Sequence, residues 1–179
     1  MKKVLIISTS LRENANSEIL AHETEKGARD AGHEVEFITL KNKNIKFCKG
    51  CMACQKTGKC VIDDDANEIT AKIKEANVIV WATPVYYYEM SGQMKTLIDR
   101  ANSLFATGKS FTEVYVITTS ADSSESVVQT VINGLNGWIA CFRGVDFCGY
   151  LNGGGLDAPG EALNRQSLLQ KAYNLGKNI

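Results

Sequence analysis

The stretch Val78-Ile79-Val80-Trp81-Ala82 is apolar at every position, and it decides the fold of this chain. Successive side chains of a strand point to opposite faces of its sheet, so a strand with no polar alternation must be covered on both faces. Helices cover both faces when they connect the strands of a parallel sheet. The stretch therefore predicts a central strand of a parallel sheet.

Further strand candidates alternate with helical segments on both sides of this stretch. The other strands are expected at residues 3–7, 35–40, 114–118 and 145–151. The helices are expected at residues 17–31, 66–76, 92–105, 124–139 and 160–175. Alternating strands and helices form a doubly wound parallel sheet. We therefore predict an α/β fold with a five-stranded parallel sheet in the flavodoxin-like order 2-1-3-4-5, built as a single domain over residues 1–179.

The charges of the chain balance, with 20 basic and 20 acidic residues. Such a chain has no general attraction for nucleic acid or for an anionic membrane, so neither is expected as a partner. The apolar run near the N-terminus is too short for a signal sequence, and no run has the length of a membrane span. We therefore expect a cytoplasmic protein whose 6 cysteines serve metal binding or redox chemistry rather than disulfides.

Residues 8–17, which follow the first strand, carry hydroxyl, amide and guanidinium groups. Ligands of this sheet type bind beyond the carboxyl ends of the strands where the strand order reverses, between strands one and three. A helix N-terminus with an arginine nearby suits a phosphate group. The absence of a GxGxxG or Walker A pattern argues against a dinucleotide or a nucleoside triphosphate. The candidate phosphate ligands are Ser10, Arg12, Asn16 and Ser17, although Asn16 or Ser17 could simply cap the helix.

The central strand runs into a proline and three consecutive tyrosines. The proline stiffens the chain where it leaves the strand. Three tyrosines at the mouth of a sheet cannot all be core residues, so this loop is expected to face a flat ring, or else to line a subunit contact. The candidate ring-binding residues are Pro84, Val85, Tyr86, Tyr87 and Tyr88. Together with the phosphate loop, they predict a mononucleotide such as FMN.

The loop after the fourth strand offers further hydroxyl groups at the same edge of the sheet. Thr119 and Ser120 are candidates for contact with the ring edge or the ribityl chain of the mononucleotide, although the loop is equally suited to cap the next helix.

Four cysteines fall within residues 48–60, inside a long segment with no regular pattern. Loops of this length are usually functional or disordered. The candidate metal ligands are Cys48, Cys51, Cys54 and Cys60. Their close spacing suits a four-iron cluster better than a structural zinc ion, whose ligands come as two separated pairs. The lysines around them also favour thiolates, so a metal-free set of redox thiols remains an alternative.

In combination, these motifs resemble the NAD(P)H-dependent FMN reductase and iron–sulfur flavoprotein families of the flavodoxin-like class, over nearly the whole chain. The markers are Ser10-Leu11-Arg12 with Asn16-Ser17, Cys48-x2-Cys51-x2-Cys54-x5-Cys60, and Pro84-Val85-Tyr86 leading to Lys95 and Asp99-Arg100. The resemblance implies FMN bound by these loops, two-electron reduction of the flavin, and assembly as dimers or larger oligomers. The phosphate loop lacks the glycine of many relatives. Proteins with this cysteine spacing occur with and without a cluster, so the resemblance leaves the cluster open.

Two functions are therefore predicted. The first is an FMN-dependent oxidoreductase that takes a hydride from NADH or NADPH and reduces a quinone, a flavin, an azo or nitro compound, or iron. The second is an electron carrier with a [4Fe-4S] cluster. No catalytic side chain is expected, because the cofactor carries the chemistry. A signalling receiver domain is rejected, because it needs acidic residues where this chain has Ser8 and Thr83.

The remaining reactive residues are expected to be structural. Cys141 and Cys148 lie in or beside apolar segments and are predicted to be small core residues. Lys95 and Asp99 are four residues apart on a predicted helix, so we expect an ordinary ion pair and no catalytic role for them or for the neighbouring Arg100.

Overall fold

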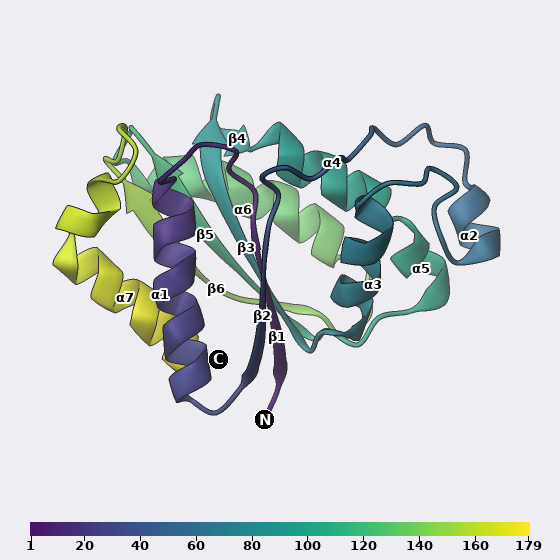
Figure 1. Ribbon diagram of the computed structural model, residues 1–179, viewed down its shortest axis with the longest axis horizontal. Helices are drawn as coiled ribbons and strands as arrows, with labels where there is room; N and C mark the ends of the chain where they lie inside the picture. Colours follow the sequence, from purple (N-terminus) through teal and green to yellow (C-terminus); the bar gives the residue numbers. More distant parts are fainter.

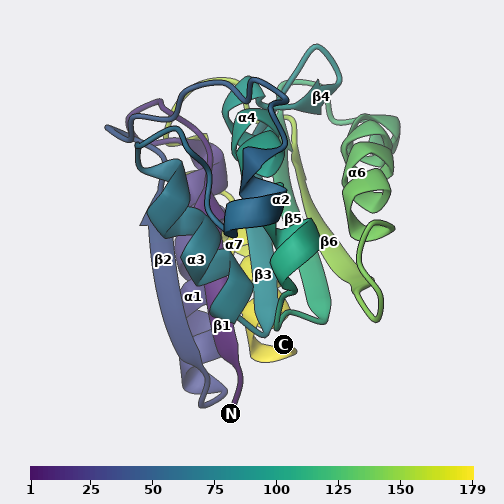
Figure 2. The same ribbon diagram turned by 90° about the vertical axis from the view of Figure 1, so that its right-hand side faces the viewer.

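A parallel sheet runs through the middle of the computed structural model, which describes residues 1–179 (Figure 1). Its strands are β1 (Lys3–Ser8), β2 (Glu34–Thr39), β3 (Val78–Tyr86), β5 (Glu113–Ser120) and β6 (Asp146–Gly154). They are hydrogen-bonded in the order β2-β1-β3-β5-β6, which confirms the predicted flavodoxin-like order because β4 (Glu89–Met90) is only a short antiparallel return on β3. The hairpin of β3 and β4 projects beyond the edge of the sheet (Figure 2).

Helices cover both faces of the sheet. Figure 1 shows α1 and α7 on one side and α3, α4 and α6 on the other. The long helices are α1 (Asn16–Asp30), α3 (Ala66–Glu75), α4 (Gly92–Arg100), α6 (Glu125–Ile139) and α7 (Gln166–Lys177). None of the helices is long and apolar enough to cross a membrane.

Two predicted helices differ from the structure by more than one residue, and one helix was not predicted. The helix expected over residues 92–105 ends at Arg100, and a short α5 (Ser103–Thr107) follows it. The helix expected from residue 160 begins as a 3-10 turn, η1 (Glu161–Asn164), before α7. The segment over residues 41–64 contains one short helix, α2 (Ala53–Thr57), which stands beside α5 at the end of the molecule away from α1 (Figure 1).

The central strand β3 is buried as predicted. Its side chains point alternately to the two faces of the sheet, so they belong to two separate parts of the core. Ile79 and Trp81 belong to the cluster under α3, α4 and α6. Val78, Val80 and Ala82 belong to the cluster under α1 and α7. Because this one strand contributes side chains to both clusters, its apolar sequence accounts for the helices that cover both faces of the sheet.

Helices α1 and α7 approach each other closely through two glycines. A Cβ atom added to Gly27 would lie 2.0 Å from the carbonyl oxygen of Tyr173, and one added to Gly176 would lie 1.9 Å from the carbonyl oxygen of Thr24. Backbone atoms at these distances cannot be displaced by a side-chain rotation. The two helices can therefore pack this closely only because both positions lack a side chain.

Gly27→Ala is expected to lower the free energy of unfolding by about 1–3 kcal/mol, because the added methyl group forces the two helices apart. Gly137→Ala on α6 is the matched control, since its Cβ would meet no atom within 4 Å. There the substitution is expected to raise stability by about 0.5–1 kcal/mol through helix propensity. Urea unfolding of both variants measures the difference, and equal effects would contradict the close helix contact.

Candidate functional site

The loop that follows β1 and the ends of β3 and β5, which extend further than predicted, meet at the carboxyl edge of the sheet and line a cavity of about 140 Å³. The predicted residues that line this cavity, called the loop cavity below, are Ser10, Arg12, Asn16, Ser17, Pro84, Val85, Tyr86, Thr119 and Ser120. The structure thus brings together the three loops that sequence reasoning selected. It adds a fourth wall from residues 156–159, which follow β6 and which no motif had indicated.

Ser17 is the residue most suited to an anion in this cavity. Its side chain is fully buried, and its hydroxyl oxygen has no hydrogen-bond partner. It lies in the first turn of α1, where unpaired N–H groups and the helix dipole favour negative charge. Because a buried hydroxyl without a partner is costly, its position here indicates a ligand that supplies one.

Asn16 and Arg12 hold the fourth wall in place. The Asn16 amide donates to the carbonyl of Ala158 at 2.9 Å and accepts from the N–H of Ala162 at 3.0 Å. One guanidinium nitrogen of Arg12 donates to the carbonyl of Asp157 at 3.2 Å, and the side chain is otherwise exposed. The Asn16 side chain is therefore engaged at both ends, whereas Arg12 retains free donors.

The tyrosine loop forms a tight two-residue turn between β3 and β4. Tyr87 and Tyr88 both have positive φ angles, 50° and 62°, which such turns require and which side chains other than glycine or asparagine seldom adopt. Tyr86 lines the loop cavity, but Tyr87 is fully exposed and neither it nor Tyr88 lines that cavity. Only the first part of the predicted ring-binding loop therefore reaches the cavity.

Buried hydroxyl groups fix the base of this hairpin. The Ser91 N–H donates to the Thr83 hydroxyl at 3.0 Å, and the Ser91 and Thr9 hydroxyls are 3.0 Å apart. Thr9 also donates to the carbonyl of Ala82 at 3.0 Å. These contacts tie the loops after β1 and β3 into one rigid unit.

The two predicted residues of the third loop, Thr119 and Ser120, are the last residues of β5 and have different surroundings. The Ser120 hydroxyl donates to the carbonyl of Asp122 at 2.7 Å, which leaves its oxygen able to accept. Thr119 is nearly buried between this loop and Gly153, where an added Cβ would lie 2.9 Å from the Thr119 methyl carbon. The close approach of β6 therefore depends on a glycine at this position.

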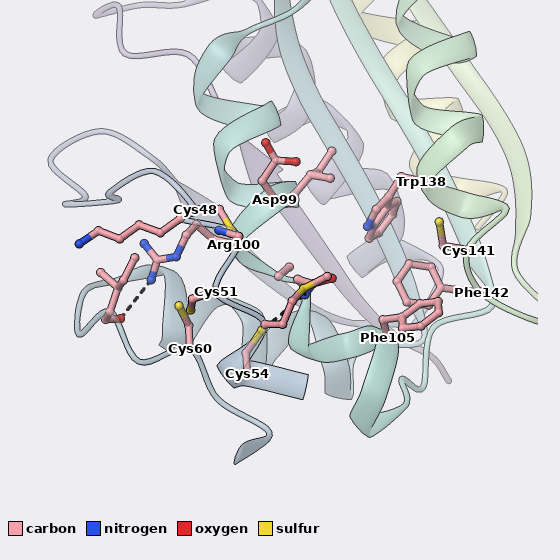
Figure 3. Close-up of a pocket in the computed structure, with 17 residues that line it drawn as sticks. Cys48, Cys51, Cys54, Cys60, Asp99, Arg100, Phe105, Trp138, Cys141 and Phe142 are labelled. Carbon is pink, nitrogen blue, oxygen red and sulfur yellow. Dashed lines mark hydrogen bonds between the residues drawn. The ribbon is translucent and has the colours of Figure 1, made fainter. Parts of the chain in front are cut away.

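A second cavity, called the cysteine cavity below, lies at the far end of α4 and measures about 460 Å³ (Figure 3). All four predicted ligands, Cys48, Cys51, Cys54 and Cys60, line it. Figure 3 shows them on one side, with Trp138, Phe142 and Cys141 on the other. No three His, Cys, Asp or Glu side chains converge on a single ion position in the chain. The four thiols thus surround a space rather than a point.

Two of these sulfurs accept hydrogen bonds from nitrogen. The Gly50 N–H donates to the Cys48 sulfur at 3.4 Å, and the Asn102 amide donates to the Cys54 sulfur at 3.5 Å. Gly50 has a φ angle of 65°, which favours glycine and turns the chain between Cys48 and Cys51. Hydrogen bonds to sulfur stabilise thiolates and adjust the potentials of iron–sulfur clusters.

A buried ion pair that sequence reasoning missed lies beside the cysteines. Arg100 donates to both carboxylate oxygens of Asp64, at 2.5 and 2.8 Å, and neither side chain is exposed. Burial alone would raise the pKa of Asp64, but hydrogen bonds from Arg100 and from the N–H groups of Lys46 and Ala66 outweigh it and hold that pKa below its usual value of 3.8. No local pattern links two residues so far apart in the sequence.

Two other expectations can be compared with the structure. Lys95 and Asp99 form the predicted exposed ion pair, at 2.7 Å. The prediction that Cys141 and Cys148 are core residues is wrong, because both are exposed. Cys141 comes directly after α6, whose end forms the aromatic wall of the cysteine cavity, so the apolar residues around it belong to a cavity wall rather than to the interior.

The two cavities have no lining residue in common. The sheet order, together with a loop cavity at its carboxyl edge, defines a flavodoxin-like protein. The sequence of the NADPH-dependent FMN reductase family matches residues 2–146, and the chain belongs to this family.

Curated relatives agree with this assignment, and a solved structure agrees with the fold. An iron–sulfur flavoprotein of Methanocaldococcus jannaschii is 33% identical, over 99% of this chain and 95% of the relative. One from Archaeoglobus fulgidus is 32% identical, over 100% of this chain and 79% of the relative. The structure of an NAD(P)H:quinone oxidoreductase from Methanothermobacter marburgensis superposes on this one with a TM-score of 0.72 and 17% sequence identity. The superposition covers 99% of this chain and 96% of the oxidoreductase, and it supports the fold.

Proposed function

We propose that this protein is an FMN-dependent oxidoreductase that takes a hydride from NADH or NADPH and reduces a small acceptor such as a quinone, a flavin, an azo or nitro compound, or iron. The observation that carries the proposal is the unpartnered, buried Ser17 hydroxyl at the N-terminus of α1, inside a cavity lined by three predicted loops. The family supports NAD(P)H as the reductant. The proposal includes assembly as a homodimer or a larger oligomer.

The residues of the loop cavity divide between the two ends of FMN. Ser10, Ser17, Arg12 and the first N–H groups of α1 hold the phosphate, because they combine hydroxyl donors, a guanidinium and a positive helix end. Pro84, Val85 and Tyr86 contact the ring. Thr119 and Ser120 lie where they can contact the ring edge or the ribityl chain. Tyr87 and Tyr88 are exposed and do not line this cavity in the single chain.

The lining of the loop cavity offers little for acid–base catalysis. The only carboxylate among the lining residues is that of Asp157, and no histidine lines the cavity. Bound FMN would supply the hydride and electron chemistry, so the residues of this cavity contribute position and exclusion of water rather than proton transfer. The rigid hydroxyl network under the tyrosine hairpin serves this positioning.

Ser17→Ala tests the phosphate site with two readouts of opposite direction. The stability of the FMN-free protein is expected to stay the same or rise, because the substitution removes a buried hydroxyl without a partner. FMN affinity is expected to fall, since the phosphate loses a donor.

Arg12→Ala is expected to weaken FMN binding about tenfold or more, because a charge-assisted hydrogen bond is lost.

The matched control for Arg12 is Arg143→Ala, which removes an exposed arginine between α6 and β6. Its FMN affinity should equal that of the wild type. Heat-released cofactor is identified by chromatography, and affinity is measured by flavin fluorescence. Release of FAD alone, or unchanged affinity in both Ser17→Ala and Arg12→Ala, would contradict the proposed site.

A second function is favoured by the cysteine cavity, namely single-electron transfer through a [4Fe-4S] cluster. Four thiols of the chain line one cavity, and two of their sulfurs accept N–H hydrogen bonds. Thiolates are the ligands of such clusters. Two relatives that align over the whole chain carry the name iron–sulfur flavoprotein. We infer that Cys48, Cys51, Cys54 and Cys60 hold the cluster, which an assay of iron and acid-labile sulfide tests.

A further inference from the structure

Arg100 fastens the two ends of the cysteine segment, residues 46–64, to helix α4. Besides its two bonds to Asp64, it donates to the carbonyl of Lys46 at 2.7 Å and to the carbonyl of Ile62 at 3.1 Å. Asp64 in turn accepts from the N–H of Lys46 at 2.9 Å. One guanidinium and one carboxylate therefore join positions on both sides of the four cysteines to the end of a core helix.

The segment between these ends has few other attachments to the domain. Its only regular element is α2, and most of its residues are exposed. The Asn67 amide donates to the carbonyls of Cys60 and Ile62, at 3.2 and 2.9 Å, and Asn102 contacts Met52 and Cys54. The Arg100–Asp64 pair is the only ion pair that the segment makes, and neither of its side chains is exposed.

One donor of Arg100 remains unused by the backbone and by Asp64. Its Nε atom is buried and has no hydrogen-bond partner, and the residue lines the same cavity as Cys60. The unpaired Nε–H of Arg100 and the thiol of Cys60 therefore belong to residues that line the same cavity.

We propose that Arg100 is the positioning residue of the cysteine site: with Asp64 it sets the geometry of the segment that carries the four cysteines, and its Nε–H serves the sulfur of Cys60. The second part rests on the proposed cluster function. Four thiolates and a cluster bring negative charge to the cavity, and a buried guanidinium beside one ligand offsets it. An ion pair needed only for stability could be replaced by apolar residues.

The experiment uses three forms of the full-length protein. Arg100→Gln removes the cation. Asp64→Leu combined with Arg100→Met removes both charges together, so that no uncompensated buried charge remains to unfold the protein. Lys95→Gln is the matched control, because it removes one positive charge from the same helix at an exposed ion pair.

The first readout is hydrogen exchange by mass spectrometry on the FMN-loaded, iron-free protein. In the double variant, amides of residues 46–64 are expected to exchange about tenfold faster or more, while those of the sheet keep the wild-type rate. Lys95→Gln should match the wild type throughout. Unchanged exchange in residues 46–64, or faster exchange spread equally over the whole domain, would overturn the positioning role.

The second readout is the reduction potential of the cluster in anaerobically loaded protein. Arg100→Gln is expected to lower this potential, because a cationic donor beside a sulfur ligand is lost. A potential equal to that of the wild type would overturn the role of the Nε–H. If wild-type protein binds no iron, the cluster function fails and the Nε–H role fails with it, whereas the exchange measurement still decides whether Arg100 positions the segment.

Discussion

Asp64→Asn is expected to lower the free energy of unfolding by about 3–5 kcal/mol at neutral pH, because it leaves the guanidinium of Arg100 buried without its counter-charge. Both side chains are fully buried, and Arg100 makes two short bonds to the carboxylate. Asp99→Asn is the control. It removes a carboxylate from an exposed ion pair on α4, the helix that carries Arg100, and should cost only about 0–1 kcal/mol. Urea unfolding measures both variants.

The same ion pair predicts how stability depends on pH. The pKa of Asp64 in the folded protein lies below its usual value of 3.8. The ionised carboxylate therefore contributes its full share of the free energy of unfolding above the unfolded-state pKa, near 4. That contribution is lost as the pH falls through the lower folded-state pKa. Wild-type protein should lose this stability below about pH 4, and Asp64→Asn should lack that part of the acid dependence. Parallel acid profiles of the two proteins would contradict the assignment.

Cys51→Ala is expected to abolish iron binding while FMN remains bound. A four-iron cluster needs its full set of cysteine ligands, whereas the loop cavity shares no residue with the cysteine cavity. After strictly anaerobic purification, the wild type should contain about four irons and matching acid-labile sulfide per chain. The variant should lack both and keep its flavin absorption.

Cys148→Ala is the matched control, because this cysteine is exposed and does not line the cysteine cavity. It should retain the iron of the wild type. Iron retained by Cys51→Ala would exclude the proposed ligand set. If the wild type contains no iron, and flavin content and NAD(P)H oxidation are intact in both proteins, the chain functions as an FMN reductase with metal-free thiols near its surface.

The sheet order and the place of the loop cavity could be predicted because they depend on local patterns. Each strand and helix is encoded by the period of its own apolar residues, and the apolar stretch at residues 78–82 could be stable only in the middle of a covered sheet. A parallel sheet then brings the loops after alternate strands to one edge without further information. The sequence could therefore place Ser10, Arg12 and Ser17 at one cavity, while their contact with a phosphate stays a prediction.

Contacts between distant segments were decided only by the tertiary structure. Nothing in the local sequence pairs Asp64 with Arg100, places Cys141 opposite the motif cysteines, or engages the Asn16 amide with residues 158 and 162. The direction of Tyr87 likewise depends on the tight turn that β4 imposes. Periodicity determines which face of an element is buried, but a specific polar contact depends on how two elements meet, and that is a property of the packed chain.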